Sequence, residues 1–217
     1  MKKTIVCMLA IAGFATSAYS QTSTTSTELG NTTFGIRAGI NFQNLNGKDA
    51  SDRNLKNKMK VGVNIGANAE IPVAEDFYVQ PGLLFSTKGA KIENTDTKVN
   101  LSYLEIPINL LYKPVLGDGN LLLGFGPYIG FAVGGKIGDT DIKFEKEVSQ
   151  AEAATGAYSK RFDAGANLLV GYELSSRISA QLNAQLGLVN IQPKVTGLDT
   201  DAKTKNTGFG ISIGYRF

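Results

Sequence analysis

Strict alternation of apolar and small polar residues is the feature that most constrains the fold of this chain. Residues 206–217 read NTGFGISIGYRF, where each large apolar residue is followed or preceded by glycine, serine or arginine. Successive side chains of a β-strand point to opposite faces, so this period of two predicts a strand with one apolar and one small polar face. A free apolar strand edge promotes aggregation. The pattern therefore raises the question of what this strand pairs with and which solvent its apolar face meets.

The same alternation recurs along the chain, at residues 34–43, 61–71, 77–86, 103–112, 121–134, 162–174 and 178–188. With the last segment this makes eight predicted strands. The links alternate in length: PVAED, KPVLGDGN and SSR are short, and the four at roughly 44–59, 89–98, 135–160 and 191–206 are long and polar. Short turns at one rim and long loops at the other predict an all-β, eight-stranded antiparallel up-and-down barrel. In the third long link, IKFEKEVSQAEAAT is compatible with a short helix over the barrel mouth or with disorder.

The small polar faces decide which way the barrel is oriented. A lipocalin-like soluble barrel turns its apolar face inward, whereas a membrane barrel turns it outward. The polar faces here consist mainly of Gly, Asn, Gln and Ser, whereas a soluble exterior carries many Lys and Glu. An eight-stranded barrel has room inside only for side chains to fill it. We therefore predict a transmembrane barrel whose large apolar residues face lipid.

Aromatic residues are placed as two girdles of a membrane barrel. On three strands the apolar face begins and ends with aromatics eight residues apart, which spans roughly 26 Å of strand and roughly 20 Å of membrane at the usual tilt. The predicted periplasmic-side girdle is Phe34, Phe77, Tyr112, Tyr172, Tyr215 and Phe217. The predicted outer girdle is Phe42, Phe85, Phe131, Phe162 and Phe209. Core aromatics of a soluble sandwich are the weaker alternative.

A few charged residues share the predicted inner face: Arg37, Glu70, Glu105, Glu173 and Arg216. Buried charges persist when they are paired and hydrogen-bonded. We therefore predict a network in the lumen that links Arg37 and Arg216, on neighbouring strands, to the glutamates. A plug that fixes the strand register is the favoured interpretation, and a path for protons or ions is the alternative.

The first residues predict a secretion signal. A basic start, Met1-Lys2-Lys3, precedes an apolar core, and small residues precede a cleavage site between Ser20 and Gln21. We therefore divide the chain into a signal peptide (1–20), a flexible periplasmic segment (21–32) and a barrel domain (33–217). Without residues 1–20 the net charge falls from +3 to +1 (20 Lys+Arg against 19 Asp+Glu) and the single cysteine is lost. A near-neutral chain gives no reason to expect nucleic acid as a partner.

Several segments resemble one family. FGIRAGIN, YLEIPINLLYK, GPYIG and the closing GFGISIGYRF are similar to the PorT-like outer-membrane β-barrel family, with Leu104-Glu105-Ile106-Pro107 the most specific piece. The resemblance covers the chain after the signal peptide. It implies insertion by the outer-membrane barrel machinery, with Tyr215 and Phe217 in the recognised strand. The namesake of the family is implicated in a secretion system, a role that we do not transfer.

Catalytic chemistry has little support in the sequence. The chain has no histidine, which removes Ser-His-Asp triads and the commonest metal ligand. GFGPYIG lies within a predicted strand and lacks the dinucleotide-binding spacing. The loop acids Asp139, Asp141, Asp199 and Asp201 are candidates for Ca²⁺, but we interpret them as solvated. No enzymatic activity, cofactor or metal is expected.

The sequence therefore predicts an integral barrel of the Gram-negative outer membrane that presents surface loops and has a plugged lumen. A narrow pore for small solutes or ions, and an accessory component of a secretion or adhesion system, are the alternatives. A soluble ligand-binding barrel is the least favoured. Outer-membrane lipid and the insertion machinery are the expected partners, and no surface ligand is indicated.

Overall fold

The computed structural model describes residues 30–49, 51–93, 95, 97–198 and 202–217. The predicted signal peptide with its cleavage site, most of the predicted periplasmic segment, and the loop acids Asp199 and Asp201 lie outside these residues. None of the helices in the described part is long and apolar enough to cross a membrane.

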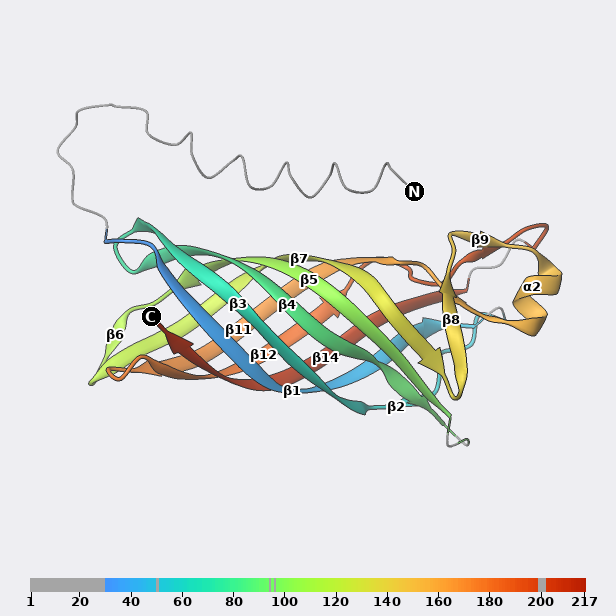
Figure 1. Cartoon of the computed structure of the whole chain (residues 1–217), viewed down its shortest axis with the longest axis horizontal. Helices are drawn as coiled ribbons and strands as arrows, with labels where there is room; N and C mark the ends of the chain where they lie inside the picture. The colour runs from blue at the N-terminus through green and yellow to red at the C-terminus, as the bar shows by residue number, and fades with distance from the viewer. Residues whose placement is uncertain (1–29, 50, 94, 96, 199–201) are drawn as a thin grey trace, which may run out of the picture.

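Eight long strands form one closed antiparallel barrel (Figure 1). They are β1 (Thr33–Lys48), β3 (Lys60–Ala74), β4 (Phe77–Ile92), β5 (Lys98–Tyr112), β7 (Gly119–Ile137), β11 (Phe162–Leu174), β12 (Ile178–Gly187) and β14 (Lys203–Arg216). Each strand pairs with the next barrel strand in the chain, and β14 pairs with β1. The predicted fold class is confirmed.

The pairing of β1 with β14 closes the barrel. Ile36 lies opposite Tyr215 in this register, and the Phe217 N–H donates to the Phe34 carbonyl at 2.8 Å. The strand at residues 206–217 is therefore paired on both sides, with β1 and with β12. Closure leaves it no free edge, which removes the aggregation hazard of an unpaired strand.

The barrel is apolar outside and polar inside. Outward-facing Ile65 and Ile213 are 59% and 66% exposed, whereas inward-facing Glu70 and Asn109 are each 1% exposed. A soluble protein would reverse these values, because burying carboxylates and amides while exposing isoleucines costs free energy on both counts. The orientation predicted from the small polar faces is the one that the structure has.

Short turns join the strands at one end of the barrel, and long links at the other. At the short-turn end, β6 (Val115–Leu116) pairs with the start of β7. At the long-loop end lie β2 (Asn57–Lys58), β8 (Thr140–Phe144), β9 (Glu147–Val148), α2 (Gln150–Thr155), β10 (Ala157–Ser159) and β13 (Lys194–Val195). The barrel strands also reach further into the long links than predicted, as β4 does to Ile92 and β1 to Lys48. Here the pairing continues beyond the apolar band, so hydropathy alone did not reveal it.

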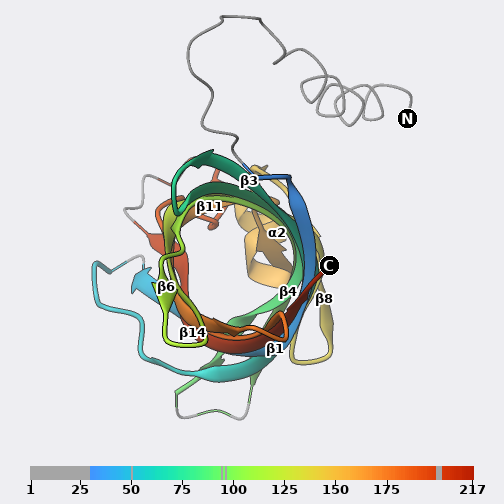
Figure 2. The same cartoon turned by 90° about the vertical axis from the view of Figure 1, so that its left-hand side faces the viewer.

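We call β8, β9, α2, β10 and β13 the cap. The parallel pairing of β8 with β10 lies within the link between β7 and β11, whereas the parallel pairing of β9 with β13 joins that link to the one between β12 and β14. A hydrogen bond from the Thr196 N–H to the Val148 carbonyl (2.8 Å) joins the same two links. For the link between β7 and β11 the sequence left a short helix or disorder open, and the structure has the helix, α2. A capping box between Ser149 and Glu152 fixes where this helix begins. The Ser149 backbone and side-chain hydrogen bonds lower the pKa of Glu152. Seen along the barrel, α2 falls within the outline of the far mouth (Figure 2).

Candidate functional site: the barrel lumen

A lysine fully buried in the lumen forms the first charge cluster. Lys88 Nζ lies 2.6 Å from Glu105 Oε1 and 3.2 Å from Asp163 Oδ2, and the lysine and Asp163 are each 0% exposed. The rings of Tyr103 and Tyr128 lie 5.3 and 4.3 Å from Nζ, in cation–π contact. We call these five residues the lysine cluster. Its members come from β4, β5, β7 and β11.

Hydrogen bonds from the opposite wall complete the lysine cluster. Gln185 Nε2 on β12 donates to Glu105 Oε2 at 2.9 Å, and Asn206 Nδ2 on β14 donates to Asp163 Oδ2 at 2.9 Å. Tyr128 Oη also donates to Asp163 Oδ2, at 3.2 Å. Strands β4, β5, β7 and β11 are thus joined to β12 and β14 through the interior. The cluster therefore crosses the lumen.

A second charge cluster lies at the short-turn end. Lys113 Nζ lies 2.9 Å from Glu70 Oε2 and 2.7 Å from Glu173 Oε1. Arg216 pairs with Glu70 through Nη2, and its Nε lies 4.0 Å from Glu173 Oε2. We call these four residues the rim cluster. Two cations and two carboxylates balance, and Lys113 keeps an 11% exposed side chain.

A row of amides and an apolar layer fill the lumen above the rim cluster. Gln80 donates to Glu70 (3.3 Å), Asn109 to Gln80 (3.2 Å) and Asn167 to Asn109 (3.0 Å). Beside this row the side chains of the apolar layer pack together, namely Leu111, Leu122 and Leu169, with Tyr78 against them. Each of these hydrogen bonds replaces one that the buried amide would otherwise make to water.

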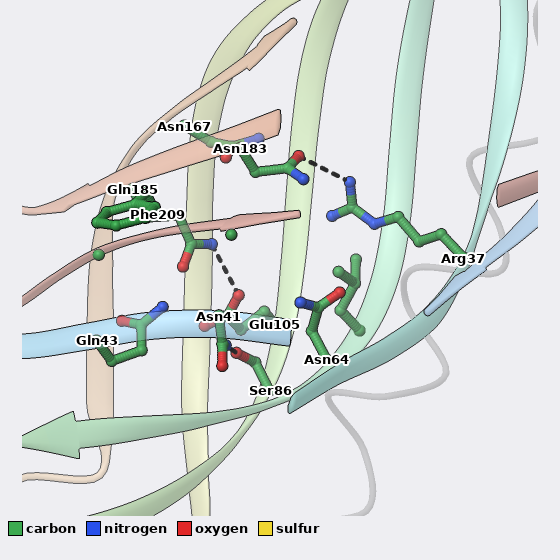
Figure 3. A pocket seen from close by; sticks show the side chains of 13 residues that line it. Arg37, Asn41, Gln43, Asn64, Ser86, Glu105, Asn167, Asn183, Gln185 and Phe209 are labelled. Atoms are coloured by element: carbon green, nitrogen blue, oxygen red, sulfur yellow. Dashed lines mark hydrogen bonds between the residues drawn. The ribbon is translucent and has the colours of Figure 1, made fainter. Parts of the chain in front are cut away.

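Arg37 lies between the two clusters and departs from the prediction. Its Nη1 donates to Asn183 Oδ1 at 3.2 Å and Gln181 Oε1 at 3.5 Å (Figure 3). Among the described residues, no carboxylate lies within ion-pair distance of its guanidinium. In the structure Arg37 thus has no direct ion pair with any of the glutamates of the predicted network. The long arginine side chain reaches the amides of β12 instead, two strands from its own.

A small polar cavity separates Arg37 from the lysine cluster. It encloses about 30 Å³ and is lined by both Arg37 and Glu105 (Figure 3), which is space for a water molecule or two. Lys88 against Glu105 and Asp163 leaves one negative charge, and Arg37 supplies one positive charge. The positive charge of Arg37 and the net negative charge of the lysine cluster therefore balance across the cavity, without a direct ion pair.

Of the predicted lumen charges, the structure brings Arg216, Glu70 and Glu173 together, and holds Glu105 in a separate cluster.

Three charged residues of the lumen were not in the predicted set. Lys88 and Asp163 lie on the inner face by simple alternation, and Lys88 follows the predicted third strand by two residues. Extending that strand would have found it. Lys113 lies in the link KPVLGDGN, and no sequence signal distinguishes it from a solvated turn lysine.

The predicted girdle aromatics lie on the outer surface in contacting pairs. At the long-loop end Phe42 stacks on Phe209 (5.1 Å between centroids) and Phe131 meets Phe162 edge-on (5.6 Å), with Phe85 38% exposed. At the short-turn end Phe77 stacks on Tyr112 (4.8 Å) and Tyr215 meets Phe217 (5.3 Å). Phe34 is 62% exposed there, and Tyr172 donates to the Leu116 carbonyl at 2.6 Å. Registration between neighbouring strands produces three of these pairs, Phe42–Phe209, Phe77–Tyr112 and Phe131–Phe162, whereas Tyr215 and Phe217 lie two residues apart in the chain.

The described loop acids do not form a cation site. Asp141 lies 3.4 Å from Lys136 Nζ, and both Asp139 and Asp141 are exposed. Within the described ranges, no three His, Cys, Asp or Glu side chains are grouped so as to hold a metal ion.

The lumen offers balanced charges, amide hydrogen bonds and packed leucines. This arrangement can hold strands in register and occupy the interior.

The chain is similar to known outer-membrane proteins. Residues 19–192 match the family described as outer membrane protein beta-barrel domain. No curated protein sequence matches the chain significantly. Among solved structures, Ail, the attachment invasion locus protein of Yersinia pestis, is 13% identical over 87% of this chain and 100% of its own, with a TM-score of 0.44. OprG from Pseudomonas aeruginosa is 13% identical over 85% of this chain and 95% of its own (TM-score 0.48).

A major outer membrane protein from Thermus thermophilus is likewise 13% identical, over 87% of this chain and 100% of its own (TM-score 0.40). Similarity at this level assigns no function to the chain. The family match covers most of the sequence and agrees with the closed barrel and its lipid-facing exterior. The chain belongs to the outer membrane protein beta-barrel domain family, and it is an integral protein of the Gram-negative outer membrane.

Proposed function

We propose that the protein is a closed membrane anchor that presents its cap at the cell surface. The observation that carries this proposal is the lysine cluster, which joins strands on opposite sides of the lumen. We propose no enzymatic activity and no cofactor for the barrel.

Electrostatics support a plug rather than a conducting path. An ion that crossed the lumen would have to displace Lys88 from Glu105 and Asp163. Removing one partner from a buried ion pair costs about 3–5 kcal/mol. The cavity beside Arg37 encloses only about 30 Å³, and the apolar layer lies below it. A permeating ion would therefore meet paired charge and hydrocarbon in succession.

The structure of the cap supports the proposal that the protein presents a defined surface outside the cell. Loops on a rigid scaffold commonly carry binding function. Here two long links pair with one another through β9–β13, and the pairing of β8 with β10 braces the longer link internally. The Lys160 N–H also donates to the Ile191 carbonyl at 2.6 Å. Burial and the neighbouring Lys194 lower the pKa of Lys160. These links thus hold side chains in defined positions above the barrel.

Within the family, we propose that the chain is a PorT-like member. The support is the segment Leu104-Glu105-Ile106-Pro107. We also propose that the insertion machinery of outer-membrane barrels recognises the last strand through Tyr215 and Phe217. Both residues lie on the outer face, 44% and 60% exposed, where a partner can reach them before lipid does.

Conductance in planar lipid bilayers tests the plug. The wild-type barrel, with its folded state checked by heat-modifiable migration, should give no steady single-channel current. A variant that combines Lys88→Ala, Glu105→Ala and Asp163→Ala with Leu122→Ala and Leu169→Ala removes the charges that cross the lumen and opens the apolar layer, and should conduct. Leu104→Ala, on the outer face, is the matched control and should remain silent. Steady conductance by the wild type would overturn the plug and favour the narrow pore.

Co-purification from detergent-solubilised membranes addresses the accessory role. The proposed anchor should be recovered alone, with no stoichiometric partner, when extraction is mild. Stable recovery of a secretion or adhesion component that is lost when cap residues 138–159 are replaced by a short glycine-serine link would favour the accessory role instead.

A further inference from the structure

An apolar cavity lies between the barrel mouth and the cap. Its volume is about 370 Å³. The barrel contributes Leu45 and Leu101, which are 6% and 2% exposed, and the long links contribute Ile142 and Ile191, at 7% and 3%. The cap helix α2 reaches it through Ala153. The cavity is thus built from segments that are far apart in the sequence and that meet only at this mouth.

The wall of the cavity is mainly apolar and uncharged. No charged side chain of the described residues lines the cavity, although the surrounding links are rich in lysine and glutamate. Several polar residues of the wall already have partners: Asn57 donates to the Leu45 carbonyl (2.8 Å) and Thr204 to Gln192 Oε1 (2.9 Å). A molecule inside would therefore meet mainly hydrocarbon, and a charged molecule would find no counter-ion.

The cavity ends blindly toward the membrane. Tyr103 of the lysine cluster belongs to the same packed group as Leu45 and Leu101, so the cluster that closes the lumen forms the floor. A molecule that enters from the long-loop side has no continuation through the barrel. The arrangement suits retention of a molecule and does not suit its passage.

The size is beyond what imperfect packing explains. Protein interiors are packed nearly as densely as organic crystals, with few voids larger than a water molecule. An apolar cavity of about 150 Å³ already binds benzene, and ligand sites occupy about 300–1,000 Å³. Water beside the leucine, isoleucine and valine side chains of the wall would find few hydrogen-bond partners there. An apolar occupant avoids that cost.

We propose that this cavity binds one small, uncharged apolar molecule taken from outside the cell. The cap, held by β8–β10 and β9–β13, forms its roof, and α2 borders its opening through Ala153. Retention of the molecule rests on the proposed plug of the lumen, whereas binding to the apolar wall does not, so conductance and probe binding test the two proposals separately. It assigns to the cap a ligand class rather than only a surface for display.

Fluorescence titration with N-phenyl-1-naphthylamine tests the site. The folded protein is kept in amphipol, and the non-saturable signal of the amphipol alone is subtracted. The wild type should bind the probe saturably at one site. Ala157→Phe places a ring in the cavity and should weaken binding at least tenfold. Ala154→Phe, on the exposed side of the same segment and outside the cavity lining, is the matched control and should bind as the wild type does.

A second filling variant, Ala153→Phe on α2, decides the matter if Ala157→Phe fails to give heat-modifiable folded protein. Competition with an anilinonaphthalene sulfonate tests the ligand class, because the sulfonate has no counter-ion in the wall and should displace the probe poorly. Absence of saturable binding would overturn the proposal. So would unchanged affinity in the filling variants, or displacement by the sulfonate as effective as by uncharged naphthalene.

Discussion

The two charge clusters of the lumen bury similar groups in different ways. In the rim cluster two carboxylates share two cations, and Lys113 retains contact with water. In the lysine cluster two carboxylates share one cation, and Lys88 is 0% exposed. The rim cluster can tolerate the loss of one partner, because a second cation and solvent remain. The lysine cluster has no such reserve.

The difference shows how a buried excess of charge is accommodated. The rings of Tyr103 and Tyr128 supply cation–π attraction to Lys88, and amides from β12 and β14 supply hydrogen bonds to the acids. Arg37 faces the remaining negative charge across the small cavity. Away from bulk water, each of these contacts matters more than it would at the rim, since the effective dielectric constant is lower.

Removing the single cation of the lysine cluster should have the largest effect. Lys88→Met leaves Glu105 and Asp163 buried without their partner, so the free energy of unfolding should fall by about 3–5 kcal/mol. Denaturant unfolding in detergent, followed by heat-modifiable migration, measures it. The control is Lys113→Met in the rim cluster, where Arg216 remains. Equal losses in the two variants would contradict the distinction between the clusters.

A glycine between the clusters tests how tightly the wall is packed there. A Cβ on Gly126 would lie 2.0 Å from the Ile108 carbonyl oxygen, whereas a Cβ on Gly134, near the mouth on the same strand β7, would meet nothing within 4 Å. Gly126→Ala should therefore lower stability by about 1–3 kcal/mol through forced backbone shifts. Gly134→Ala should leave the unfolding midpoint near that of the wild type. A tolerated alanine at position 126 would mean that the strands can separate at this level.

Double-mutant cycles should separate Arg216 from Arg37. Arg216 contacts Glu70 directly, so Arg216→Gln and Glu70→Gln should show a coupling energy of about 0.5–3 kcal/mol. Arg37 bonds to Asn183 and Gln181 instead, so its cycle with Glu70 should be additive within about 0.3–0.5 kcal/mol. Strong coupling between Arg37 and Glu70 would restore the single network predicted from the sequence.

The smallest effect should come from an ion pair outside the lumen. Lys48 and Asp52 lie 2.8 Å apart with side chains 47% and 66% exposed. Exposed pairs are screened by water and salt and contribute little. Asp52→Asn should leave the unfolding midpoint unchanged within error, at low and at high salt. A clear loss would show that charge pairs stabilise this barrel regardless of burial.

Alternation in the sequence was sufficient to predict the barrel, its inside and its outside, because each strand face reads directly from a period of two. It was also sufficient to place Arg216, Glu70 and Glu173 at one end. It did not predict the partner of Arg37, because that depends on which strands lie across the lumen. Nor did it predict Lys88, since strand pairing continues past the apolar band by hydrogen bonds that composition does not mark. The apolar cavity was equally hidden, because its wall combines the ends of barrel strands with long links whose overall composition is polar.

The seam between β1 and β14 also has a kinetic consequence. Ile36 and Tyr215 come together although nearly the whole chain separates them, so every other strand can be synthesised and exported before the ring can close. Until then the two strands that form the seam must be kept from pairing with other chains. Contacts between such distant segments form slowly, and a single missed closure leaves two open edges rather than one. The pairing of β1 with β14 is therefore the last step of assembly, and the barrel stays open until it occurs.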